Sequence, residues 1–208
     1  CAVAILIFAI GGFVVWCYRT VAPVSGTYQV AGLADTVVIK FDQYERPFVR
    51  AKTFDDALFA QGWLHAHHRF WQMEMFRRAG KGRLSELLGS SMLDSDRELW
   101  RMGVPQLAKQ LEANASAEMR GHVAAYVKGI NAAIESKASY PPEFLLLQAA
   151  VEDWTAADVY AMGALMAFQS AKNSGNELLR LAILTELGRA RAEIFFPDDG
   201  NQTEFPYV

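Results

Sequence analysis

The spacing of apolar and polar positions divides the chain into an apolar, a strand-like and a helical part. Residues 1–18 carry no charge, and a run of this length is typical of a membrane-spanning helix, which needs about 20 residues. Trp16 and Tyr18 close the run and Arg19 follows it, as aromatic and basic residues do at a membrane interface. We therefore expect a transmembrane anchor over residues 1–18 and a linker over residues 19–26.

Three alternatives to an uncleaved anchor remain open. A cleavable signal peptide ends in a small-x-small site, whereas the small residues here run into Pro23. A buried core helix is a further interpretation, although eighteen apolar residues without a polar face suit lipid better than a globular core. Cys1 suggests a lipoprotein cysteine, although such a residue normally opens a polar tether. Because the sequence begins with Cys and not Met, we expect a fragment that lacks its first residues.

The residues after the linker have the pattern of short β-strands. Three runs rich in β-branched and aromatic side chains are separated by turn-forming residues, and they cover residues 27–30, 36–41 and 47–50. This pattern predicts an antiparallel meander over about residues 27–50.

From Thr53 onward the apolar positions recur at helical spacing. Thr53 and Asp56 resemble a capping box, which marks the start of a helix. The predicted helices cover residues 54–79 and 84–88, about five turns after Ser116, the stretch between Thr155 and Lys172, and residues 177–187. The fold class predicted for residues 27–208 is therefore α+β, with strands first and helices over about residues 54–190.

The composition argues against several classes of partner and site. The 208 residues have a formal net charge of −3 and no basic stripe, which argues against a nucleic-acid partner. Both cysteines, Cys1 and Cys17, lie in the apolar run, so the rest of the chain has neither a disulfide framework nor a cysteine-ligated metal site.

Two polar clusters each have two interpretations. His65 and His68 are three residues apart and suggest a metal site with His67 or Glu74, but packing against neighbouring tryptophans explains them better. A group of basic residues suggests an anion site, although structural ion pairs are the stronger interpretation. This group comprises Arg77, Arg78, Lys81 and Arg83.

No nucleophile motif of a known kind is present, yet the order of several motifs is informative. These motifs are GLADTVVIKFD from Gly32, PFV from Pro47, FDDALFAQG from Phe54, HAHHRFWQMEMFRR from His65, GRLSELLG from Gly82, PPEF from Pro141, and Trp154 with Asp158. In this order they resemble the precursor α-subunit of the penicillin acylase family, which are amide hydrolases with an N-terminal nucleophile. The resemblance covers roughly residues 26–188.

The resemblance implies a mostly helical α-subunit whose N-terminal strands contribute to an αββα sandwich. The catalytic serine would begin a separate β-subunit cut from the same precursor, so no catalytic residue is expected in this chain. The substrate would be a small N-acyl amide. The soluble part would lie outside the cytoplasmic membrane, in the periplasm or beyond the cell.

An ungapped alignment from Trp154 and Asp158 assigns roles to four residues. It places Ala167, Ser170 and Ala171 in the wall of the acyl pocket, where the small side chains suggest a wide or long pocket. It places Glu177 as a ligand of a structural Ca²⁺. Without the resemblance, Glu177 is a helix-start acid favoured by the helix dipole.

Two positions depart from the family pattern. Glu45 stands where the family's Asp-x-x-Gly-x-Pro turn has glycine, which matters if the position needs a positive φ. His68 replaces an acid. The alternative function, from a different class, is a non-catalytic membrane-anchored binding or sensor protein built from the same helices.

Overall fold

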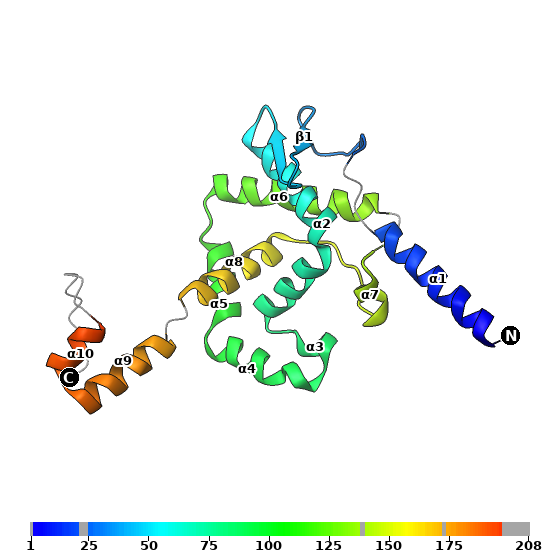
Figure 1. Cartoon of the computed structure of the whole chain (residues 1–208). Helices are drawn as coiled ribbons and strands as arrows, with labels where there is room; N and C mark the ends of the chain where they lie inside the picture. The colour runs from blue at the N-terminus through cyan, green and yellow to red at the C-terminus, as the bar shows by residue number, and fades with distance from the viewer. Residues whose placement is uncertain (1, 21–24, 138–139, 172–173, 197–208) are drawn as a thin grey trace. The chain divides into compact units, whose positions relative to one another are not determined.

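The computed structural model describes residues 2–20, 25–137, 140–171 and 174–196 (Figure 1). The chain forms two compact units, residues 1–166 and residues 167–208. Within the described residues the first unit is mostly helical and carries one small antiparallel sheet, and the second is helical. The predicted α+β class is confirmed at this level.

The N-terminal apolar run forms helix α1 (Ala2–Thr20). In the part of the chain that the structure describes, no helix meets the length and apolarity that crossing a membrane requires. The expected transmembrane helix over residues 1–18 is therefore not supported. Of the expected linker, residues 21–24 lie outside the described residues.

The sheet is a hairpin of β1 (Val38–Phe41) and β2 (Pro47–Arg50). Val38 pairs with Arg50 and Phe41 with Pro47 in antiparallel register. The prediction was right for β2 and too long for β1. It was wrong for residues 27–30, which form no strand. Strand propensity alone does not make a strand where no neighbouring backbone pairs with it.

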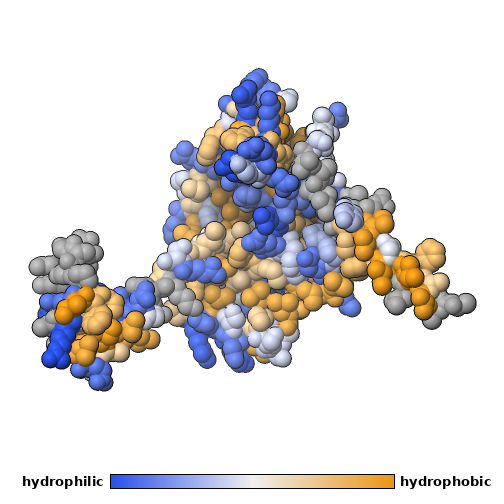
Figure 2. Space-filling model, in the orientation of Figure 1, coloured by the Kyte–Doolittle hydropathy of each residue, from blue (hydrophilic) through white to orange (hydrophobic). Residues whose placement is uncertain are grey.

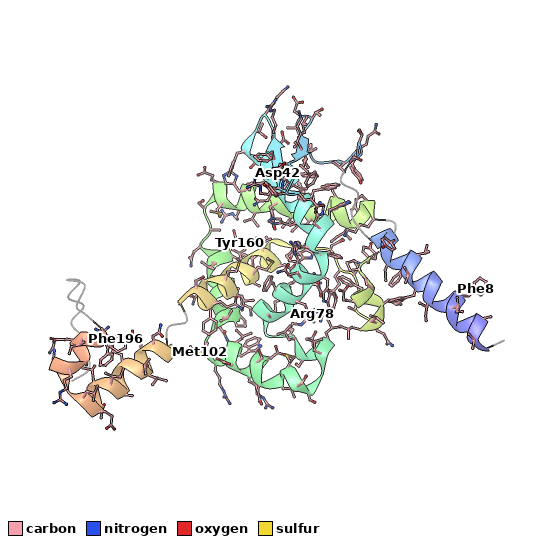
Figure 3. The ribbon with its side chains drawn as sticks, in the orientation of Figure 1. Phe8, Asp42, Arg78, Met102, Tyr160 and Phe196 are labelled. Atoms are coloured by element: carbon pink, nitrogen blue, oxygen red, sulfur yellow. The ribbon has the colours of Figure 1, made fainter. Side chains whose placement is uncertain are left out.

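Asp42 organises the turn between the two strands (Figure 3). Its Oδ1 accepts hydrogen bonds from the backbone N–H groups of Tyr44 and Arg46 at 2.8 and 3.0 Å. Glu45 has a φ of 59°, in the left-handed region. The sequence departure noted at Glu45 therefore falls at a position that favours glycine.

The core lies between two long helices, α2 (Phe54–Lys81) and α6 (Ala117–Ser136). The side chains of Thr53 and Ser116 cap them as predicted, by accepting from the N–H groups of Asp56 and Met119. The helices cross closely, because a Cβ on Gly62 would lie 2.1 Å from the carbonyl oxygen of Tyr126.

Shorter helices follow the two long ones. They are α3 (Ser85–Leu88), the 3-10 turn η1 (Ser90–Met92), α4 (Leu93–Arg101), α5 (Val104–Ala113), α7 (Pro142–Leu146), α8 (Ala156–Ala171), α9 (Ser174–Leu187) and α10 (Arg189–Phe195). The sequence predicted α3, α8 and α9, although α9 begins three residues earlier than expected, and it missed η1, α4, α5, α7 and α10. Gly89 ends α3 as expected.

Candidate functional site

The residues predicted for the acyl pocket lie in the last turns of α8. Ala167, Ser170 and Ala171 are spaced i, i+3 and i+4, so they share one face of the helix, and all three are exposed. Glu177 lies in the first turn of α9 and is also exposed. Residues 172 and 173, between the two helices, lie outside the described residues. The roles of these four residues in binding stay predictions.

The start of α8 is held by a buried carboxylate. Asp158 is 1% exposed, and its Oδ2 accepts hydrogen bonds from the backbone N–H and the hydroxyl of Thr155 at 2.8 and 2.6 Å. Lys81, at the end of α2, forms an ion pair with it. Burial alone raises the pKa of Asp158, but the hydrogen bonds from Lys81 and Thr155 outweigh it and leave the pKa below its usual value. The carboxylate is therefore a structural cap.

Trp154, just before α8, is held in place by hydrogen bonds to its backbone groups. The side-chain Oδ1 of Asn131 accepts from the N–H of Trp154 at 2.8 Å, and the Nδ2 of the same amide donates to its carbonyl at 3.0 Å. The ring of Trp154 is 2% exposed. Further along, a Cβ on Gly80 would lie 2.3 Å from the carbonyl oxygen of Ala161, so α2 and α8 are in direct backbone contact.

A buried acid joins Arg77 and Arg78 on α2. Glu74 is 1% exposed, and its two oxygens pair with Arg77 and Arg78, each at 2.6 Å. The guanidinium of Arg77 also lies 5.4 Å from the centre of the Trp154 ring. Since Lys81 pairs with Asp158, the basic cluster forms structural ion pairs, and the anion-site interpretation is not supported.

Asp96 of α4, which lies further along the chain, holds the GRLSE loop of residues 82–86. Its two carboxylate oxygens accept hydrogen bonds from the consecutive N–H groups of Leu84 and Ser85, at 2.9 and 2.8 Å. Gly82 ends α2 with a φ of 64°, in the left-handed region, and its carbonyl accepts from the indole N–H of Trp100 at 3.3 Å. The left-handed conformation explains the glycine in this motif. Asp96 and Trp100, which lie further along the chain, hold the loop in place.

The histidines on α2 serve in packing. His65 shares a hydrogen bond of 2.8 Å with the hydroxyl of Tyr126. His67 stacks on Trp63 with the ring centres 4.2 Å apart, and His68 meets Phe41 edge-on. Among the residues that the structure describes, no three acids, histidines or cysteines gather to hold a metal ion. The packing interpretation of the cluster is thus supported.

His67 is an unusual buried histidine. It is 7% exposed, and neither ring nitrogen has a hydrogen-bond partner among the described residues. Burial, with smaller contributions from Lys137 and His68, lowers the pKa of His67 to about 4. The ammonium of Lys137 donates to the carbonyl of His67 at 3.2 Å, and burial lowers its pKa to about 8. A charged imidazole is therefore disfavoured at this position.

Sequence reasoning missed two of the contacts that hold α8 and the GRLSE loop. Asn131 and Asp96 belong to none of the motifs described above, yet each binds backbone groups 11 to 23 residues away. Side chains that hold loops in this way leave no periodic signal. The one available signal is a polar residue placed within or beside an apolar face, as Asn131 is beside Ile130 and Ala133.

Solved structures share this architecture. A structure described as a thermostable penicillin G acylase from Alcaligenes faecalis aligns with a TM-score of 0.58 and 24% identity, over 83% of this chain and 96% of that chain. The fold is therefore that of a penicillin acylase chain.

Comparisons of sequence agree with the fold. The penicillin amidase family model matches residues 36–203. The penicillin acylase 2 proenzyme of Pseudomonas sp. (strain SE83) is 33% identical over 184 residues, which are 86% of this chain and 23% of that protein. The acyl-homoserine lactone acylase QuiP of Pseudomonas syringae pv. tomato is 29% identical over 200 residues, 91% of this chain and 23% of that protein. This chain belongs to the penicillin amidase family, and it spans about a quarter of the length of these relatives.

Proposed function

We propose that this chain is the α-subunit portion of an amide hydrolase that cleaves an N-acyl amide. The observation that carries the proposal is a contrast in coverage. The chain matches 96% of one chain of a solved penicillin G acylase but only 23% of a relative named as a proenzyme. A processed subunit accounts for both values. The partner is then a β-subunit derived from the same precursor.

The nucleophile in this proposal is the N-terminal serine of the β-part, outside this chain. Its hydroxyl oxygen attacks the amide carbonyl carbon while its own α-amino group takes the hydroxyl proton. The C–N bond then breaks, the amine leaves with that proton, and the acyl group stays on the serine as an ester. Water cleaves the ester and regenerates the serine. Oxyanion donors on the β-part stabilise the tetrahedral intermediates.

This chain contributes the wall of the acyl pocket. The side chains of Ala167, Ser170 and Ala171 are small and lie on one exposed face of α8. A pocket bordered by small side chains accepts a longer acyl group than one bordered by aromatic side chains. A relative named as an acyl-homoserine lactone acylase supports an acyl chain as the substrate group. We therefore assign a long or bulky acyl group to the substrate.

Glu177 is proposed as one ligand of a structural Ca²⁺. A carboxylate oxygen suits this hard cation, and Glu177 is exposed in the first turn of α9. Within the described part of the chain no other acids cluster into a metal site, so the remaining oxygen ligands would come from the β-part. Bound calcium would supply a structural link between the two parts and no reaction chemistry.

The hairpin is proposed to join the sheets of an αββα sandwich. An isolated two-stranded sheet is marginally stable in water. Here Val38, Phe48 and Val49 are large apolar side chains that remain exposed on the hairpin. Additional strands from the β-part would cover them.

The test is expression of the complete gene. We expect two polypeptides on a denaturing gel, with serine as the first residue of the larger one, and release of amine from N-acyl amides. Replacing that serine by alanine abolishes amine release. The alternative, a non-catalytic binding or sensor protein, predicts one polypeptide and no hydrolysis, and that result would remove the proposal.

A further inference from the structure

Lys137, the C-cap residue of α6, places its amine against α2. The amine donates to the backbone carbonyl of His67 at 3.2 Å and lies 5.5 Å from the centre of the Phe70 ring. Lys137 is half-buried, and among the residues that the structure describes no ion pair joins it to an acid. Its charge is therefore stabilised only by one carbonyl and one aromatic face.

The charges around Lys137 do not favour a further positive charge. The charges of Lys137 and Arg69 both lower the pKa of His68, so these basic groups lie close enough to repel one another. On α7, one carboxylate oxygen of Glu143 is buried without a hydrogen-bond partner in the described part of the chain, so that oxygen does not bind Lys137. Glu45 of the hairpin raises the pKa of His68 but less strongly.

Burial makes the neutral amine of Lys137 unusually abundant. It lowers the pKa of Lys137 to about 8. At pH 7 such an amine is neutral in about one molecule in ten, against roughly one in three thousand for an ordinary lysine. The neutral amine is the nucleophilic form, and a desolvated lysine is a recognised covalent nucleophile. The proposed hydrolysis does not use this group.

The surroundings of the amine suit an electrophile with an apolar chain. Phe70 stacks on Phe144 of α7 with the ring centres 4.9 Å apart. The same short helix continues with Leu145 and Leu146, which are 65% and 66% exposed. Figure 2 shows apolar surface where α7 lies in Figure 1. An acyl chain that packs on this surface removes apolar area from water and brings its polar end toward Lys137.

We propose that Lys137 is a covalent modification site for lactones that carry an acyl chain. The inference takes its substrate class from the proposed function and from the relative named as an acyl-homoserine lactone acylase. The amine nitrogen attacks the ring carbonyl carbon, a C–N bond forms and the ring C–O bond breaks. The proton lost by the nitrogen passes to the freed alcohol oxygen. The product is an amide on Lys137 that carries the whole opened ring, and no further reactant is needed.

Competitive acetylation tests the reactivity of the amine. The complete protein is treated at pH 7 with a limiting amount of the N-hydroxysuccinimide ester of acetic acid, and the modified peptides are quantified by mass spectrometry. Lys109, which is exposed on α5, is the matched control. We expect Lys137 to be acetylated at least fivefold faster than Lys109 at pH 7, with a smaller advantage at pH 10, where ordinary lysines are also partly neutral. A rate at pH 7 equal to or below that of Lys109 would overturn the proposal.

Incubation with N-hexanoyl-homoserine lactone tests the reaction itself. We expect Lys137 to gain the mass of a ring-opened homoserine unit, with or without its hexanoyl group. Lys137→Arg keeps the positive charge and should form at least tenfold less adduct, whereas Lys109→Arg should form as much as the unmodified protein. No adduct, or an equal yield in Lys137→Arg, contradicts the proposal. Transfer of the hexanoyl group alone also contradicts it, because that product does not come from ring opening.

Amine release from a phenylacetyl amide, measured on the same samples, separates this site from the proposed function. Lys137→Arg should release amine at the rate of the unmodified protein, because Lys137 is neither a proposed pocket residue nor the nucleophile. A protein that releases amine but forms no adduct keeps the proposed function and loses only this site. A protein that forms the adduct but releases no amine keeps the site and loses the proposed function.

Discussion

Gly129 of α6 lies against the main chain of Phe59 of α2, so that a Cβ on this glycine would sit 1.9 Å from the carbonyl oxygen of Phe59. No side chain fits there without separating the helices that enclose the core. Gly129→Ala is expected to lower the free energy of unfolding by about 3 kcal/mol or more. Urea titration of Gly121→Ala is the matched control, because a Cβ on Gly121, in the same helix, meets open space. That variant should gain up to about 1 kcal/mol.

Glu45→Gly is expected to stabilise the chain. Glu45 has a φ of 59°, a conformation that costs a residue with a Cβ about 1 kcal/mol and costs glycine almost nothing. The free energy of unfolding should therefore rise by about 1 kcal/mol in a urea titration. Glu45→Ala keeps the Cβ and should show no such gain. Equal stability of the two variants would mean that the turn does not strain Glu45.

His67 is expected to make stability depend on pH. Its pKa is lowered to about 4 in the fold, from 6.5 in the unfolded chain. The fold therefore favours the neutral ring, so stability is full above pH 6.5 and declines as the pH falls toward 4. His67→Phe should retain the stacking on Trp63 and flatten this decline. Burial also lowers the pKa of His65 and His68, so part of the slope should remain. An unchanged slope in His67→Phe would contradict the assignment.

Ala171→Phe is expected to narrow the acyl pocket. In the complete protein, hydrolysis of a dodecanoyl amide should fall at least tenfold relative to a phenylacetyl amide. Gln169→Phe is the matched control, because Gln169 is exposed on the opposite face of α8 and should leave the ratio unchanged. The same assay with the unmodified protein tests the wide-pocket proposal directly. A clear preference for phenylacetyl would remove it.

Glu177→Gln is expected to abolish the effect of calcium on stability. The melting temperature of the complete protein should fall by about 5 °C when a chelator removes Ca²⁺ and should not respond in Glu177→Gln. Glu186→Gln, on the same helix and also exposed, should behave like the unmodified protein. No response of the unmodified protein to the chelator would leave Glu177 as a helix-start acid.

Local signals in the sequence predicted much of the fold. Thr53 and Ser116 cap their helices through N–H groups three residues away, and contacts of this range leave a recognisable pattern. The strand over residues 27–30 was wrong because strand formation needs a partner, and the hairpin does not supply one. Asp96 acts on Leu84 and Ser85 across 11 to 12 residues, a relationship that spacing alone does not show. The roles of Ala167, Ser170, Ala171 and Glu177 depend on the proposed β-part.

Asn131 forms two hydrogen bonds with the backbone of Trp154, and such contacts fix α8 in the fold. The residues proposed to line the acyl pocket are different ones. Asn131, Asp158 and Lys81 fix the start of α8 through buried polar contacts, and none of them is a proposed pocket residue. Substitutions at Ala167, Ser170 and Ala171 replace exposed side chains and disturb none of those contacts. If these three residues line the acyl pocket as proposed, substrate preference can diverge through a few mutations at little cost in stability, without redesign of the fold.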